Sequence, residues 1–122
     1  MRITLSALLF ALYSTGCALS ESPKSEKFSG WVRFAGEFEL YDTEADMKAE
    51  KPGACMSGVL PLALQRAASN KFNFSHVSVW GFRVPRWHDP TIMYLDNEGA
   101  TIVNRCDGDF VIFANRMEQY HR

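Results

Sequence analysis

The chain has 122 residues, a length that allows one globular domain and little else. Hydrophobic residues make up 47% of it and charged residues 22%, which excludes an intrinsically disordered chain. The formal net charge of −1 shows no basic excess, so we expect no nucleic-acid partner. Nine Phe, four Tyr and three Trp favour β-sheet over helix.

The first sixteen residues have the form of an export signal. Met1 and Arg2 make a short positive start, and the apolar run over residues 3–13 is too short to span a bilayer, which needs about 20 residues. The run ends in Ser14-Thr15-Gly16-Cys17. This end resembles the lipobox of bacterial lipoproteins, in which small residues precede a cysteine that becomes acylated. Ser14 departs from the family, which usually has Leu at that place.

The resemblance implies a signal peptide over residues 1–16 and a lipid anchor on Cys17, which would hold the protein to a membrane in the periplasm or at the outer membrane. In that family an Asp after the cysteine tends to retain the protein at the inner membrane. Ala18 follows here, which favours the outer membrane. The alternative is an ordinary signal peptide cut near Ala18 or Ser20, which would leave a soluble secreted protein.

The segment after the cysteine is polar. Residues 17–29 carry Ser, Glu and Lys, include Pro23 and have little apolar content, which predicts a flexible tether. A single β-rich globular domain is then expected over residues 30–122.

The first half of this domain mixes strands and helices. Residues 31–41 alternate strictly between apolar and mixed positions, which predicts one long strand with one face on a core. Residues 42–51 suit a short helix capped by Asp42 or Thr43, and residues 54–60 predict a strand. Pro61 opens the strongest helix, over residues 62–70, which we expect to pack across a sheet or plug the end of a barrel.

The second half predicts mostly strands. Residues 73–85 make a long strand that is apolar on both faces, in which Gly81 can mark a bulge. A proline-bounded loop at 85–90 precedes a short strand at 92–95, a turn at 96–99 and a returning strand at 100–106. Asp107-Gly108 is typical of a hairpin turn. Residues 110–114 predict a central strand, and the polar tail at 115–122 suits a turn of helix.

These elements predict a mainly β (β-rich α+β) domain of about six strands with one or two short helices. Antiparallel strands with a helix among them suit a small barrel or an open sheet packed on a helix. A five-stranded barrel of the oligonucleotide/oligosaccharide-binding (OB) type is one candidate. It rests on element order alone, which implies nothing about function.

Two cysteines remain in the domain if Cys17 is acylated. In an exported protein, Cys55 and Cys106 most simply form a disulfide, which closes a loop of about fifty residues and is worth roughly 4 kcal/mol. Free thiols, or a catalytic or metal-binding cysteine, are the alternatives. Neither cysteine has a second ligand at zinc spacing or a Cys-x-x-Cys partner, so we expect no metal or cofactor.

The loop at 85–90 carries the candidate binding residues Arg86, Trp87 and His88. An exposed Trp beside Arg is common at binding hot spots, whereas the simpler interpretation is a plain loop held by the packing of Trp87. His88 precedes Asp89 and suits a general base, yet no nucleophile motif accompanies it.

Trp31 is a further, outlying candidate for binding. It shares its strand face with Tyr41, and the two form either an aromatic platform or a surface covered by the tether and the helix after Tyr41. Glu37 and Glu39 lie on the same face and could pair like glycosidase carboxylates, but acids on a wet strand face are usually just solvated. The Asp-Gly-Asp run at 107–109 lacks the other ligands of a calcium loop and predicts a turn.

The sequence therefore predicts a small exported protein that acts by binding and not as an enzyme, as an accessory protein of the cell envelope. Its partner would be an envelope protein or a glycan. The alternative is a periplasmic inhibitor or immunity-like protein that blocks a hydrolase by inserting a loop, although the motifs of the lysozyme inhibitors are absent. An enzyme that uses His88 is the third hypothesis.

Overall fold

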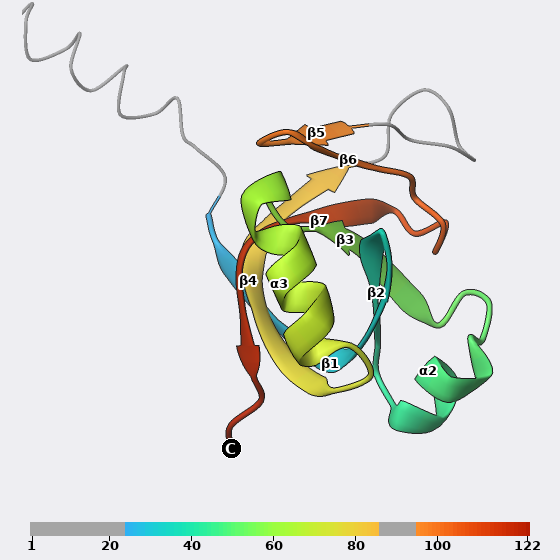
Figure 1. The fold of residues 1–122 in the computed structure, drawn as a ribbon. Coiled ribbons are helices and arrows are strands. Elements are labelled where there is room, and N and C mark those ends of the chain that lie inside the picture. Colours follow the sequence, from blue (N-terminus) through green and yellow to red (C-terminus); the bar gives the residue numbers. More distant parts are fainter. Residues whose placement is uncertain (1–23, 86–94) are drawn as a thin grey trace, which may run out of the picture.

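The computed structural model describes residues 24–85 and 95–122, which form seven strands and two short helices (Figure 1). In chain order the elements are β1 (Glu26–Ala35), β2 (Glu37–Tyr41), α2 (Glu44–Ala49), β3 (Cys55–Val59), α3 (Leu62–Phe72), β4 (His76–Pro85), β5 (Leu95–Asn97), β6 (Ala100–Ile102) and β7 (Phe110–Gln119). Five strands close into a barrel in the order β1-β2-β3-β7-β4, and β4 pairs back to β1. Strands β5 and β6 form a separate hairpin.

The barrel pairs are antiparallel except for β3 and β7, which run parallel. Helix α3 joins β3 to β4 and lies across the barrel (Figure 1). The strand order and the helix position match the OB-type barrel that the sequence suggested as a candidate. The predicted mainly β fold is confirmed, and the structure decides for a closed barrel over an open sheet. The likeness is one of topology and carries no function.

The stretch at 31–41, predicted as one strand, is the end of β1 and the whole of β2. Gly36, with a φ of +91°, turns the chain, and the two strands form a hairpin in which Phe34 lies opposite Phe38. Because the turn is one residue long, the alternation stays in phase on both sides of it, and the pattern looks continuous although the chain reverses. Strand β1 begins at Glu26, inside the segment predicted as a tether.

Two predictions for the C-terminal part are wrong. Asp107-Gly108 does not join paired strands, because β6 pairs with β5 while β7 pairs with β3 and β4. The tail after residue 114 continues β7 instead of forming a helix, because Met117 lies opposite Val79 and is buried in the barrel. Met117 belongs to the barrel core, so its burial depends on the pairing of β7 with β4.

The bulge predicted at Gly81 is confirmed. The register between β4 and β7 shifts between Trp80 and Gly81, where Asn115 is the extra residue on β7. A Cβ atom on Gly81 would lie 2.3 Å from the carbonyl oxygen of Phe113, so the close approach of the two strands requires glycine.

Both helices form where they were predicted. The N-cap of α2 is Thr43, whose Oγ1 accepts a hydrogen bond from the Asp46 amide at 3.1 Å. Helix α3 follows Pro61 and continues to Phe72, two residues beyond the predicted end. This extension buries the Phe72 ring in the barrel core and closes it from the helix side.

One cluster of apolar side chains fills the barrel. Its buried members come from β1, β2, β4 and β7, from α3 and from the residue that follows β3: Phe28, Val32, Phe34, Phe38, Leu40, Leu60, Ala68, Phe72, Val77, Val79, Ile112, Ala114 and Met117. Gly58 faces into the barrel, and a Cβ atom there would lie 2.2 Å from the Phe38 ring. The glycine on β3 therefore makes room for the large ring on β2.

A second, smaller core lies outside the barrel, where the β5–β6 hairpin covers β3 and β7. It consists of Val59, Ala100, Ile102 and Val111. Asn97 at the end of β5 is also buried, and its Nδ2 donates to the carbonyl oxygens of Val59 at 2.9 Å and Ala114 at 3.0 Å. The parallel pairing of β3 and β7 spans only two residue pairs, and Asn97 continues the connection between the strands where it ends.

Candidate functional site

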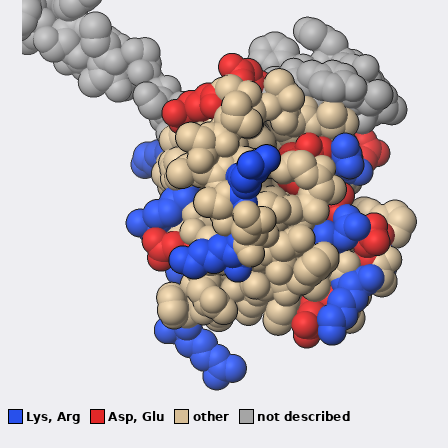
Figure 2. All heavy atoms as spheres, viewed as in Figure 1, with Lys and Arg blue, Asp and Glu red and all other residues tan. Residues whose placement is uncertain are grey.

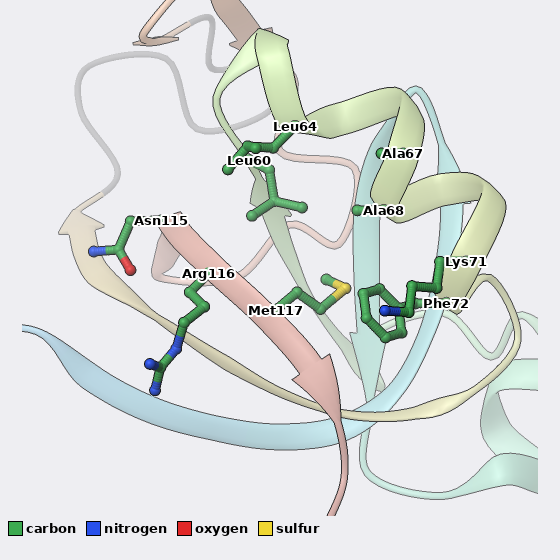
Figure 3. A pocket seen from close by; sticks show the side chains of 9 residues that line it. All are labelled: Leu60, Leu64, Ala67, Ala68, Lys71, Phe72, Asn115, Arg116 and Met117. Carbon is green, nitrogen blue, oxygen red and sulfur yellow. The ribbon is translucent and has the colours of Figure 1, made fainter.

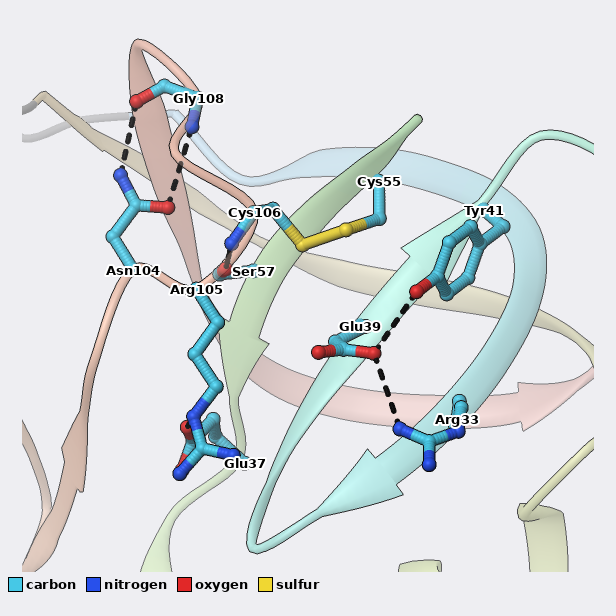
Figure 4. The surroundings of a disulfide bond; sticks show 10 residues. All are labelled: Arg33, Glu37, Glu39, Tyr41, Cys55, Ser57, Asn104, Arg105, Cys106 and Gly108. Carbon is cyan, nitrogen blue, oxygen red and sulfur yellow. Dashed lines mark hydrogen bonds and ion pairs between the residues drawn. A yellow bond between two sulfur atoms is a disulfide. The ribbon is translucent and has the colours of Figure 1, made fainter. Parts of the chain in front are cut away.

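The outer surface of β3 is covered by the loop at 103–109. Cys55 at the start of β3 and Cys106 in this loop form the predicted disulfide, with Cα atoms 5.4 Å apart (Figure 4). The Cys106 amide donates to Ser57 Oγ at 2.9 Å, and Ser57 is 1% exposed. The prediction of a disulfide is therefore confirmed, and the bridge fixes the loop on the barrel.

The loop at 103–109 is also braced from within. Asn104 is 2% exposed; its Nδ2 donates to the Gly108 carbonyl at 2.9 Å, and its Oδ1 accepts from the Gly108 amide at 3.4 Å (Figure 4). Asp107 has a φ of 58°, in the left-handed region. The turn of this loop is at Arg105 and Cys106, where the Asp107 amide donates to the Asn104 carbonyl at 3.2 Å, and the Asp-Gly-Asp run follows it.

The acids on β2 are not simply solvated, contrary to the simpler expectation. Arg105 Nε lies 2.9 Å from Glu37 Oε1, and Arg33 lies 3.5 Å from Glu39 Oε1, which also accepts the Tyr41 hydroxyl at 3.0 Å (Figure 4). The two carboxylates are only 12% and 14% exposed. Each acid is held by its own arginine, which is the arrangement of a structural ion pair.

Tyr41 belongs to this covered surface. It is 3% exposed, and α2 packs against β1 and β2 beside it. Burial, and then the hydrogen bond to Glu39, raise the pKa of the Tyr41 hydroxyl to about 12. Of the two interpretations for Trp31 and Tyr41, the covered one holds for Tyr41.

Trp31 has a different environment, in a stack of three rings from β1, from β4 and from the residue after β7. Its ring lies 4.8 Å from the His76 ring at an interplanar angle of 9°, and the His76 ring lies 4.0 Å from the Tyr120 ring at 10°. Trp31 is the register partner of His76, and the Tyr120 amide donates to the His76 carbonyl at 3.0 Å. Cross-strand register therefore brings together three aromatic residues from distant parts of the chain.

A second row lies on the same outer face. The Trp80 ring has Lys27 Nζ 5.6 Å from its centroid and Arg116 Cζ at 3.8 Å. Lys27 and Arg116 are the register partners of Trp80 on β1 and β7. We call these two rows, Trp31–His76–Tyr120 and Lys27–Trp80–Arg116, the aromatic ladder. Trp31, His76 and Trp80 are all partly exposed.

The aromatic ladder is the best candidate for a binding surface in the described chain. Of the predicted binding residues it contains Trp31; Arg86, Trp87 and His88 lie outside the described residues, as does Cys17. The other five ladder residues were missed because they come from three segments of the chain that are distant in sequence and meet only through strand pairing. The available signal was the period of two that places His76 and Trp80 on one face of β4.

Within residues 24–85 and 95–122, no three His, Cys, Asp or Glu side chains are placed to hold a metal ion. No helix in those ranges is both long enough and apolar enough to cross a membrane. Comparison of the chain with protein-family models, with curated proteins and with solved structures gives no match.

Proposed function

We propose that this chain is an exported, lipid-anchored binding domain of the bacterial cell envelope that acts without catalysis. The observation that carries the proposal is the Cys55–Cys106 disulfide. Such bonds persist in oxidising compartments and are rare in the cytosol. It supports the export signal at the start of the chain, and Cys17 is the residue that the lipid would modify.

The aromatic ladder is the proposed binding surface. Aromatic and arginine side chains are enriched at protein interfaces and at their hot spots. Stacking holds the ladder side chains in place on a rigid barrel, so little side-chain freedom is lost on binding. Stacking covers both faces of the His76 ring and one face each of the Trp31 and Tyr120 rings. Sugars pack on free ring faces, and the stack leaves at most one such face on each end ring, so an envelope protein is favoured over a glycan as the partner.

The anchor is tested by the intact mass of the protein from a membrane fraction, measured before and after reduction. We expect a diacylglyceryl-modified product that begins at Cys17 and gains two protons on reduction. The matched control is Cys17→Ser, which has no cysteine to acylate and should be absent from the membrane fraction. An unmodified product that starts beyond Cys17 would contradict the lipid anchor and make this a soluble secreted domain.

The binding surface is tested by pull-down from envelope extracts. Trp31→Ala and Trp80→Ala should each reduce partner recovery at least tenfold if the ladder carries the contact. The matched control is the double variant Trp87→Ala, His88→Ala, which changes two other predicted binding residues. Loss of recovery in the loop variant alone would assign binding to residues 86–88 and overturn the ladder.

A further inference from the structure

An apolar groove opens between α3 and β7 (Figure 3). It has a volume of about 220 Å³ and is lined by Leu60, Leu64, Ala67, Ala68, Lys71, Phe72, Asn115, Arg116 and Met117. Leu60, Phe72 and Met117 are buried members of the barrel core. The groove therefore leads from the surface to the apolar interior.

The charged side chains along the groove are both basic. They are Lys71 at the end of α3 and Arg116 on β7, and none of the nine lining residues is acidic. Lys71 Nζ lies 5.2 Å from the centroid of the Phe72 ring, at the edge of the apolar wall (Figure 3). The head of Arg116 stacks on Trp80 and pairs with Glu118 at 3.3 Å, so Lys71 is the cation placed to meet a ligand.

The mouth of the groove is apolar as well. Leu64, which lines the groove, is 45% exposed, and Ala67, which lies three residues later on the same face of α3, is exposed as well. Helix α3 contains no acidic residue. Figure 2 shows the side that carries α3, on which a basic side chain stands near the centre and the acidic side chains lie toward the margins.

We propose that this groove binds a free medium-chain fatty acid, with its chain along the apolar wall and its carboxylate at Lys71. The basic Lys71 favours a ligand with an anionic head group, and the apolar wall favours a ligand with an apolar chain. A methylene group occupies roughly the volume of a water molecule, about 30 Å³, so the groove holds about seven carbons of a chain. The groove is concave, with α3 on one side and β7 on the other, and this shape suits a single chain better than a flat bilayer surface. The groove shares Arg116 with the ladder, but the inference depends neither on the lipid anchor nor on binding at the ladder.

Chain length gives the first test, by NMR titration of the purified protein with saturated fatty acids. Burial of each methylene strengthens binding about fourfold. Octanoate should therefore bind about fifteenfold more tightly than hexanoate, while decanoate, whose chain exceeds the groove, should add less than about threefold. Shifted resonances should include those of Ala67 and Met117. A steady gain through longer chains, or no dependence on length, would overturn the assignment.

Charge gives the second test. Lys71→Gln should weaken octanoate binding about tenfold and leave binding of octan-1-ol unchanged, because only the acid uses the ammonium group. The matched control is Arg66→Gln, which removes the same charge from the same helix at an exposed position outside the groove. Equal losses in the two variants would show a general field effect and contradict a carboxylate site at Lys71.

A third variant blocks the space itself. Ala67 is exposed on α3, so Ala67→Phe fills the mouth without entering the core, and its thermal unfolding should match that of the wild type. It should abolish octanoate binding. Binding of phosphatidylglycerol vesicles by both proteins, without octanoate binding by either, would assign this face to a bilayer and overturn the proposal.

Discussion

Two parts of the outer barrel surface differ in how far the rest of the chain covers them. On β3, the outward residues Ser57 and Val59 are each 1% exposed, because the loop at 103–109 and the β5–β6 hairpin lie over them. On β1 and β4, the outward residues Trp31 and Trp80 remain partly exposed and are ordered by stacking. The covered surface on β3 contributes to stability, whereas the surface on β1 and β4 remains accessible to solvent.

The difference bears on where an OB-type barrel can bind. Such barrels commonly bind ligands on the face of their second and third strands. Here the chain's own loop, tied by Cys55–Cys106, occupies the β3 side of that face. The proposed binding surface lies instead on β1, β4 and β7.

The largest expected effect comes from removing the bridge on the covered surface. The disulfide closes a sequence separation of 51 residues, for which chain entropy gives about 4 kcal/mol. The double variant Cys55→Ala, Cys106→Ala should lose about that much free energy of unfolding in urea. Wild type measured under reducing conditions is the control and should lose a similar amount. A loss below about 1 kcal/mol would mean that the loop stays in place without its bridge.

The next effect comes from the buried amide on the same surface. Asn97→Ala leaves the carbonyl oxygens of Val59 and Ala114 without the donor and should lower the free energy of unfolding by about 2 kcal/mol. Thr101→Ala, an exposed position on the same hairpin, should change it by less than about 0.5 kcal/mol. Similar values for the two variants would contradict a structural role for the Asn97 side chain.

On the accessible surface the stability effect should be smaller. Trp80→Ala removes two cation–π contacts at a partly exposed site and should lower the free energy of unfolding by about 1 kcal/mol. Trp80→Phe should recover part of this. A loss greater than that of Asn97→Ala, in the same urea measurement, would make the ladder a structural surface like the one over β3.

The smallest effect depends on pH. The pKa of Tyr41 is raised from 10.0 to about 12 in the folded protein, so its contribution to stability is complete below pH 10 and is lost as the pH rises toward 12. Tyr41→Phe should be less stable than the wild type by about 1 kcal/mol at pH 7, from the lost hydrogen bond to Glu39. The difference should shrink above pH 10 in urea unfolding. A constant difference from pH 7 to 11 would contradict the raised pKa.

Several features were predictable because they depend on nearby residues. The N-cap at Thr43, the helix after Pro61 and the bulge at Gly81 follow from local backbone chemistry. The disulfide was predictable because the leader predicted export, and only two cysteines were left in the domain once Cys17 was set aside. In contrast, the reversal at Gly36 leaves the period of two unbroken, so alternation alone cannot reveal it.

The candidate sites also combine features that nearby residues predict with features that only contacts between distant residues create. Trp31 was recognised as an aromatic residue on a strand face, but its stacking partners His76 and Tyr120 are brought to it by pairing of β1 with β4 and by the length of β7. The groove beside α3 requires Lys71 and Met117 to meet across a helix and a strand that are distant in sequence. No local pattern contains these contacts.

The sequence by itself determined a mainly β domain, its helices and its cysteine pair, because local propensity, alternation and composition are properties of short segments. The tertiary structure alone decided that the barrel closes through a parallel pair, that the β3 surface is covered and that the ladder and the groove exist. The physical reason is that these features depend on register and closure between distant strands, and burial in the closed barrel selects one such arrangement.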